Sequence, residues 1–212
     1  MNTRPRVLLL TLAIGGSAAC DSTTAPSATM VEAEITIDFE GASLESWSQF
    51  SPGVFHLRIR RDTNSDFARW YSFRVLDGQG DDLTFRFLNA GQVSAASAFS
   101  FNRPAVSEDG GGSWSRIQGP SYDAGVFSFS YTPTSSDTWI ALGPVYNFSR
   151  MLAVVEEIRD HSMVDSVTTI AQTLQGRPLH LIKITDPAVH DSLKGAVWAI
   201  GRQHPAEVGG SW

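Results

Sequence analysis

Short runs of alternating apolar and polar residues are the feature that most limits how this chain can fold. They recur between residues 31 and 145, separated by turns rich in glycine, aspartate and asparagine. Period-two alternation of aromatic and β-branched residues predicts strands that bury one face and expose the other. The clearest runs are residues 35–39, 71–75, 83–87 and 127–131. About eight such strands with no helix between them predict an antiparallel β-sandwich.

The pattern changes after the sandwich. Asn147 can cap a helix over residues 148–160, whose apolar side chains share one helical face. Residues 166–173 and 178–185 are expected to form a hairpin around a glycine-containing turn. Residues 195–200 are apolar at every position, which is typical of a strand buried in the centre of an α/β sheet. The fold class is therefore mixed, α+β, with the start of an α/β domain after the sandwich.

The pattern at the beginning of the chain indicates a targeting segment rather than a part of the fold. Arg4 and Arg6 precede an apolar stretch, residues 7–14, which is too short to span a membrane as a mature helix. Small residues follow, and then Cys20, the single cysteine of the chain. This pattern resembles the lipobox of bacterial lipoproteins, in which the cysteine is acylated. An ordinary cleaved signal peptide is the alternative.

We therefore expect a lipoprotein signal peptide over residues 1–19 and a flexible tether over residues 20–30. Lipidation at Cys20 would attach an exported protein to the bacterial cell envelope, with the membrane as a partner through the lipid. Asp21 resembles the inner-membrane retention signal of some Gram-negative bacteria, which would place the protein on the periplasmic face.

Composition narrows the class of partner. Hydrophobic residues make up 42% of the chain, so it can bury a sizeable core. The formal net charge is −6, and the basic residues form no stripe. Nucleic acid is therefore not expected as a partner. The oligomeric state is not determined by the sequence.

A candidate metal-binding motif follows the apolar run at residues 195–200. His204 and Glu207 are three residues apart on a loop that contains Pro205. Loops at the carboxyl ends of central strands bind ligands in open α/β sheets. Histidine and glutamate, together with a second histidine, are a usual ligand set for hydrolytic zinc. The H-x-x-E pattern alone is unspecific, and by itself it favours a histidine and a glutamate on a surface loop.

The order of elements around this motif resembles the start of the M14 zinc carboxypeptidase domain. The matching segments are residues 176–179, 197–200, 204–207 and 210–212. The H-P-[GA]-E form resembles the cytosolic-carboxypeptidase branch, whose members carry a β-sandwich before the catalytic domain. The sandwich also resembles that branch in the segments 70–73, 85–89, 114–116, 127–131 and 146–149.

The resemblance implies zinc as cofactor, a peptide or protein C-terminus as substrate, and His204 and Glu207 as the first two zinc ligands. The family's third ligand, its general base and its carboxylate-binding residues are expected beyond residue 212. On this interpretation residues 31–145 are the sandwich, residues 146–212 are the incomplete N-terminal part of the catalytic domain, and the chain as given is inactive.

Other residues have simpler interpretations. The remaining histidines are expected to be surface or partly packed residues rather than ligands: His56, His161, His180 and His190. The acidic pairs at residues 81–82 and 108–109 could bind calcium but are more typical of solvated turns. Arg202 is interpreted as structural. Ser113 and Trp114 are expected in the sandwich core rather than on a sugar-stacking platform.

A second function remains open on the sequence alone. The chain could be a lipid-anchored β-sandwich binding module for carbohydrate or protein, in which the His204–Glu207 spacing is incidental.

Overall fold

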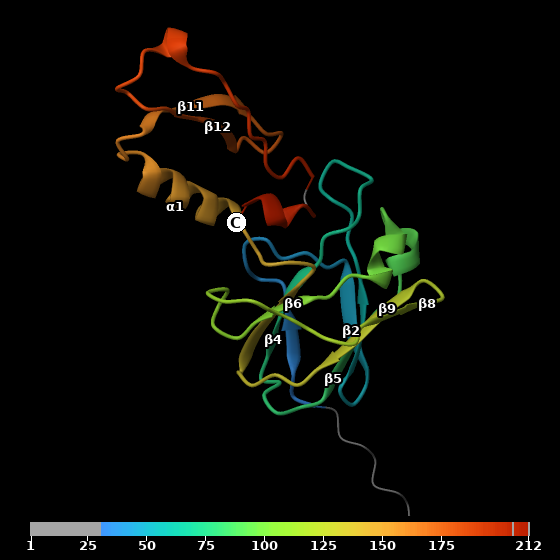
Figure 1. Cartoon of the computed structure of the whole chain (residues 1–212). Coiled ribbons are helices and arrows are strands. Elements are labelled where there is room, and N and C mark those ends of the chain that lie inside the picture. The colour runs from blue at the N-terminus through green and yellow to red at the C-terminus, as the bar shows by residue number, and fades with distance from the viewer. Residues whose placement is uncertain (1–30, 205, 212) are drawn as a thin grey trace, which may run out of the picture.

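The computed structural model describes residues 31–204 and 206–211. The predicted signal peptide, tether and Cys20 lie outside the described residues. The sandwich consists of two five-stranded sheets, with a helix and a two-stranded sheet beyond it (Figure 1).

The first sheet has the strand order β1-β4-β10-β6-β7 and is antiparallel throughout. Its strands are β1 (Glu34–Thr36), β4 (Ser72–Leu76), β10 (Asp137–Ala141), β6 (Ala105–Ser107) and β7 (Ser115–Arg116).

The second sheet has the order β2-β3-β5-β9-β8. Its strands are β2 (Ser46–Ser51), β3 (Val54–Arg58), β5 (Leu83–Phe87), β9 (Val126–Tyr131) and β8 (Ser121–Asp123). The predicted sandwich is confirmed, with ten strands rather than about eight. Two short 3-10 helices also lie within it, η1 (Ala90–Gln92) and η2 (Ala96–Ser100), where no helix was expected.

One strand pairing departs from the predicted antiparallel arrangement. β3 and β5 run parallel, with Phe55 opposite Phe85 and Leu57 opposite Phe87. The chain passes through β4 in the other sheet between these two strands. Because that passage reverses the chain direction twice, β5 returns beside β3 in the same direction.

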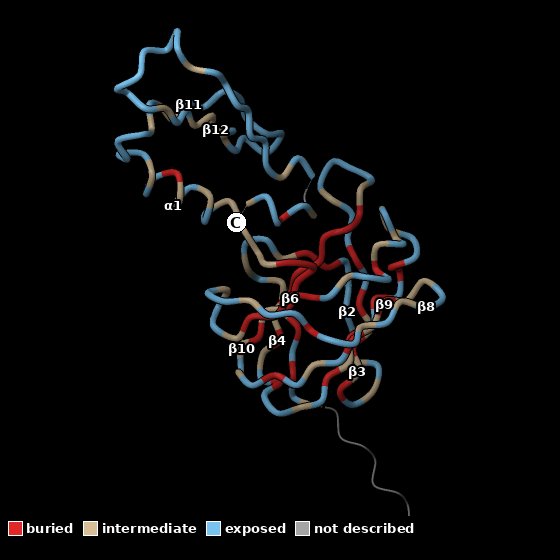
Figure 2. Tube along the Cα trace, viewed as in Figure 1, coloured by how far each residue is buried: buried red, intermediate tan, exposed pale blue. Residues whose placement is uncertain are grey.

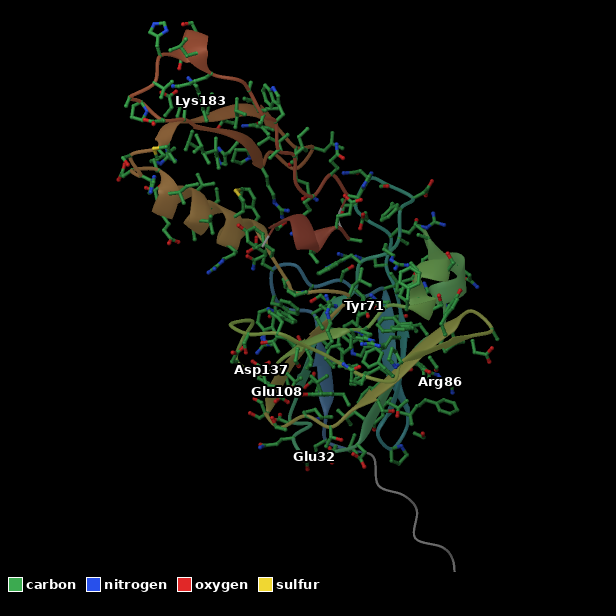
Figure 3. The ribbon with its side chains drawn as sticks, viewed as in Figure 1. Glu32, Tyr71, Arg86, Glu108, Asp137 and Lys183 are labelled. Carbon is green, nitrogen blue, oxygen red and sulfur yellow. The ribbon has the colours of Figure 1, made fainter. Side chains whose placement is uncertain are left out.

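The core between the sheets is aromatic, and it explains why the alternating runs face inward. Phe73 from one sheet packs against Phe85 from the other, with ring centroids 5.4 Å apart. Phe87 and Phe127 extend the same cluster and are fully buried. Each buried phenyl group stabilises the fold by roughly 1.5–3 kcal/mol relative to exposure. Burial is concentrated in the sandwich (Figure 2), and Tyr71 lies inside it (Figure 3).

Beyond the sandwich, the predicted helix and hairpin are confirmed. Helix α1 spans Phe148–Ile158, and the Asn147 side chain accepts a hydrogen bond from the Arg150 N–H at 2.9 Å. The backbone N–H of Ser149 also donates to the Glu40 carboxylate, which joins the helix to the sandwich.

The hairpin consists of β11 (Val164–Gln172) and β12 (Pro178–Ile184). In the turn between these strands, Gly176 has a φ of +73°, a conformation that favours glycine. Two further 3-10 helices follow along the chain, η3 (Asp191–Leu193) and η4 (Val208–Ser211).

The predicted central strand at residues 195–200 is wrong for this structure. These residues form no strand, and the side chains of Val197, Trp198 and Ile200 are 95%, 75% and 73% exposed. A run that is apolar at every position becomes a central strand only when neighbouring strands pair with both of its edges. Among the described residues none pairs with it, and β11 and β12 form a sheet of their own. Over this same part of the chain, no helix is long and apolar enough to cross a membrane.

Candidate metal site

The loop that carries the candidate ligands packs against one end of the sandwich. Val208 follows Glu207 directly and is buried, in contact with the sandwich core. A methyl group added at Gly143 would lie only 2.7 Å from Val208 Cγ2, so the fit between loop and sandwich is close. Ala206 packs against the same core. The sandwich therefore fixes the position of the loop through its apolar residues.

The two candidate ligands are brought together at the surface. His204 Nδ1 lies 2.7 Å from Glu207 Oε1, and both side chains are more than half exposed. The backbone also closes the turn, since the Glu207 N–H donates to the His204 carbonyl at 3.1 Å. The hydrogen bond from His204 lowers the pKa of the Glu207 carboxyl below its usual range, so Glu207 is a carboxylate at neutral pH.

This pair fits part of a zinc site. Imidazole nitrogen and carboxylate oxygen are both zinc donors, and two ligands of one tetrahedral ion lie about 3.3 Å apart. A small separation of the two side chains would therefore admit the ion. Within residues 31–204 and 206–211, no three histidine, cysteine, aspartate or glutamate side chains gather to hold a metal. The described residues thus supply two ligands, fewer than the three that catalytic zinc takes from protein.

Arg202 positions the start of this loop, as its structural interpretation predicts. It has a φ of +54°, and its guanidinium donates to the Tyr146 carbonyl oxygen ahead of helix α1. The guanidinium also lies 6.0 Å from the centre of the Trp70 ring. Burial lowers the pKa of Arg202. Arg202 thus joins the sandwich, the start of the helix and the loop that carries His204 and Glu207, which we call the metal loop.

Two family models match this chain along most of its length. The cytosolic carboxypeptidase N-terminal domain matches residues 35–142, and the zinc carboxypeptidase domain matches residues 151–211. This chain belongs to the M14 carboxypeptidases that have a cytosolic-carboxypeptidase N-terminal domain. The match to the zinc carboxypeptidase domain includes both His204 and Glu207.

Solved structures of carboxypeptidases share the fold. A metallo-carboxypeptidase from Burkholderia cenocepacia superposes with a TM-score of 0.77 at 27% identity, over 85% of this chain and 46% of that one. A metallo-carboxypeptidase from Pseudomonas aeruginosa, in complex with (2-guanidinoethylmercapto)succinic acid, has a TM-score of 0.64 at 26% identity, over 74% of this chain and 42% of that one.

An uncharacterized protein of Zymomonas mobilis is 24% identical over 179 residues, which are 84% of this chain and 44% of that protein. The chain thus spans less than half the length of the relatives it matches.

The other histidines of this M14 chain lie apart from the His204–Glu207 pair and have local partners. His56 stacks on Phe50 with ring centroids 4.3 Å apart. His161 and His190 accept hydrogen bonds from backbone N–H groups two residues further along. His180 lies 3.4 Å from the Thr169 hydroxyl across the hairpin. Their positions agree with packing roles.

The acidic turns are held by the protein's own groups. Asp109 accepts hydrogen bonds from the Ser107 and Ser113 hydroxyls at 2.7 and 2.6 Å. The neighbouring Glu108 accepts from the Thr134 backbone N–H. Trp114 is partly buried against the core, which supports its interpretation as a packing residue. The expectation that Ser113 also lies in the core is wrong, since Ser113 is exposed in the loop, where its hydroxyl donates to Asp109.

Sequence reasoning missed a group of arginines beside the metal loop. Arg69, Arg103 and Arg116 from the sandwich line a cavity that Glu207 also lines. No local motif marks them, because they lie about 90 or more residues from the loop in sequence and the fold alone brings them there.

Proposed function

We propose that this chain is the N-terminal part of a zinc-dependent metallocarboxypeptidase that removes C-terminal residues from peptides or proteins. The observation that carries the proposal is the pairing of His204 with Glu207 at 2.7 Å, inside the segment that matches the zinc carboxypeptidase domain. Structural similarity to two metallo-carboxypeptidases supports the same reaction class.

In the proposed enzyme, the His204 imidazole and the Glu207 carboxylate would be two of the groups that hold the zinc. When bound, zinc polarises the scissile carbonyl and makes its water a stronger acid. The sandwich holds the ligand loop through Val208 and Arg202. A third ligand and a general base are supplied by residues beyond 212 in the proposed protein, because relatives are about twice as long. The 212-residue chain is proposed to be inactive by itself.

A peptidase assay tests this proposal on the protein carrying the whole catalytic domain. Incubation with a peptide that has a free C-terminus should release terminal amino acids, observed by mass spectrometry. The same peptide with an amidated C-terminus is the control and should stay intact. Unchanged peptide in both reactions, from a protein that contains zinc, would favour the binding-module function.

We also propose that Cys20 is lipidated and holds the protein at the cell envelope. The support is the sequence pattern of residues 1–20. The Cys20→Ser variant should lose labelling by a palmitate analogue and leave the membrane fraction. The wild type should stay in that fraction, because lipoproteins carry more than one acyl chain. Labelling that survives the substitution would contradict lipidation at this residue.

A further inference from the structure

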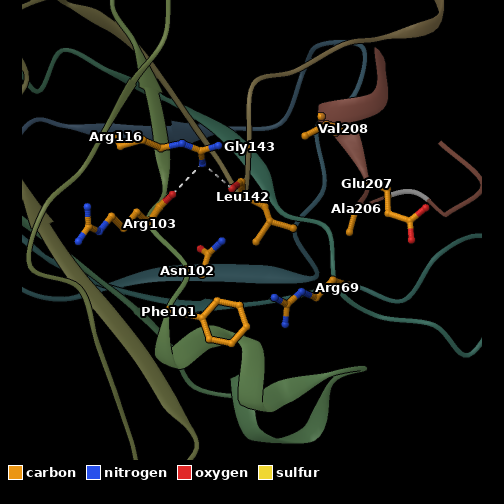
Figure 4. A pocket seen from close by; sticks show the side chains of 11 residues that line it. Arg69, Phe101, Asn102, Arg103, Arg116, Leu142, Gly143, Ala206, Glu207 and Val208 are labelled. Carbon is orange, nitrogen blue, oxygen red and sulfur yellow. Dashed lines mark hydrogen bonds between the residues drawn. The ribbon is translucent and has the colours of Figure 1, made fainter. Parts of the chain in front are cut away.

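A cavity of about 480 Å³ lies where the metal loop meets the sandwich. Figure 4 shows its lining, with Glu207 and Val208 on the loop side and arginines on the sandwich side. Glu207, a candidate zinc ligand, lines this cavity, and His204 does not.

Arg69 is the unusual residue of the lining. Arg69 is only 8% exposed, yet it forms no ion pair with any described carboxylate. One guanidinium N–H group donates to the Ala95 carbonyl at 2.7 Å, and the Phe99 ring lies 4.3 Å from Cζ. A guanidinium has five N–H donors, so further donors remain for a ligand.

The charge of Arg69 makes an anionic ligand favourable. Burial lowers its pKa, but arginine remains protonated because its ordinary pKa exceeds 12. A buried charge without a counter-ion is unfavourable, since it has lost water and gained no opposite charge. An anion in the cavity would remove this penalty. The ion pair would also be strengthened by the reduced access of water.

Two neighbouring side chains add fixed donors. Arg116 is held by hydrogen bonds from Nη1 to the carbonyl oxygens of Arg103 and Leu142, at 2.8 and 3.2 Å (Figure 4). Asn102 Oδ1 accepts from the buried Tyr71 hydroxyl at 3.2 Å. That bond occupies the amide oxygen and leaves the Asn102 NH2 group as a donor. Arginine forks and amide N–H groups are well suited to a carboxylate.

The balance of charge in the lining is positive. Arg69, Arg103 and Arg116 are cations, and Glu207 is the anion among the eleven lining residues. The Glu207 carboxylate already pairs with His204.

We propose that this cavity is a carboxylate-binding subsite on the sandwich, which holds an anionic group of a peptide ligand. The proposal rests on the proposed function for the peptide, and on Arg69, Arg116 and Asn102 for the anion. The carboxylate comes from an acidic side chain or from a free peptide terminus, and these two sources share the same chemistry.

The test is an NMR titration of the zinc-free 212-residue chain, following the arginine Nε–Hε resonances. Three acetylated dipeptides serve as probes: amidated Glu-Glu, Gln-Gln with a free C-terminus, and amidated Gln-Gln. A shift of Arg69 and Arg116 with either carboxylate-bearing peptide, and none with amidated Gln-Gln, supports the subsite and identifies the source. Equal shifts with all three, or no shift with any, would overturn it.

Variants make the test specific to Arg69. Arg69→Lys keeps the charge but loses the planar fork, so affinity should fall about tenfold. Arg86→Gln is the control, since Arg86 is exposed on β5 and does not line the cavity (Figure 3). It should bind as the wild type does.

Arg116→Gln is a second variant at an exposed position, in case Arg69→Lys does not fold, and it should weaken binding several-fold. Wild-type affinity in a folded Arg69→Lys or Arg116→Gln variant would contradict the proposal. The titration contains no zinc, so its result does not depend on whether the protein binds the metal. The carboxylate-binding subsite and the proposed zinc carboxypeptidase function can therefore fail independently.

Discussion

Asp109 organises the glycine-rich loop between β6 and β7. Its carboxylate accepts hydrogen bonds from the Ser113 hydroxyl and backbone N–H, and from the Ser107 hydroxyl. These bonds, led by the Ser113 hydroxyl, lower the pKa of Asp109 from 3.8 to about 2. The loop is thus stabilised by the ionised form of this side chain.

The depressed pKa of Asp109 predicts an acid-dependent loss of stability. The contribution is fully present above pH 3.8, the ordinary value, and is lost as the pH falls toward about 2. Asp109→Asn should unfold at lower urea concentration at neutral pH and lose less stability than wild type on acidification.

The control is Asp123→Asn, because the exposed Asp123 side chain forms no hydrogen bond or ion pair with the described residues. Asp123→Asn should unfold at the same urea concentration as the wild type and lose the same stability on acidification. The same acid dependence in Asp109→Asn as in wild type would show that Asp109 contributes nothing.

The sequence predicted the His204–Glu207 pair because a three-residue spacing brings the two side chains together locally. The metal role of the pair stays a prediction. Arg69 and Arg116 could not be predicted as neighbours of Glu207, because their proximity depends on how β7 and the segment before β4 end at the same side of the sandwich. The burial of Arg69 without an ion pair is likewise a property of the folded chain, which local sequence does not reveal.

At the scale of elements, helix α1 depends on its first turn. Asn147 Oδ1 accepts from the Arg150 N–H, and Glu40 accepts from the Ser149 N–H. Both interactions satisfy N–H groups that have no partner inside the helix. An eleven-residue helix is marginal alone, so its caps matter for its stability.

Removal of the cap should therefore loosen the helix. Asn147→Ala should cost about 1 kcal/mol of helix stability, because the Arg150 N–H loses its acceptor. The measurement is amide hydrogen exchange at residues 150–152, which should become faster. Asn147→Asp is the matched control and should retain protection, since the carboxylate accepts the same bond and suits the helix N-terminus. Equal protection in the alanine variant would contradict the role of the cap.

Strands were predictable where alternation covers five residues, as in β5 and β9. β6, β7 and β8 have two or three residues each, which is too short for a pattern to be distinguished from a loop. The parallel pairing of β3 with β5 could not be predicted from local sequence either, because it depends on the passage through the other sheet. Residues 195–200 form no strand although they are apolar at every position, because a strand needs neighbours that pair with it as well as a suitable composition.

At the scale of the whole molecule, burial is unevenly distributed. The sandwich contains nearly all of the core, while the hairpin and the segment after it expose large apolar side chains (Figure 2). Leu174 at the hairpin turn is 89% exposed. Most residues between 186 and 200 are also exposed. Such segments open at low cost in free energy.

Limited proteolysis should therefore leave a protected fragment close to residues 31–145. The earliest cuts should fall in residues 186–200, where the backbone forms few hydrogen bonds, and at the hairpin turn. Mass spectrometry of the time course identifies the fragments. A resistant fragment that extends to residue 212 would show that the C-terminal part is as stable as the sandwich.

The zinc affinity of the His204–Glu207 pair is the most direct test of the proposed metal site. We predict that the 212-residue chain binds zinc weakly, because two ligands cannot close the coordination shell. His204→Ala and Glu207→Ala should each abolish this binding, measured by isothermal titration with zinc chloride. His161→Ala, a histidine outside the loop, should bind zinc as the wild type does. Zinc binding that survives both ligand substitutions, or that is absent from the wild type, would contradict the assignment of this loop as a metal site.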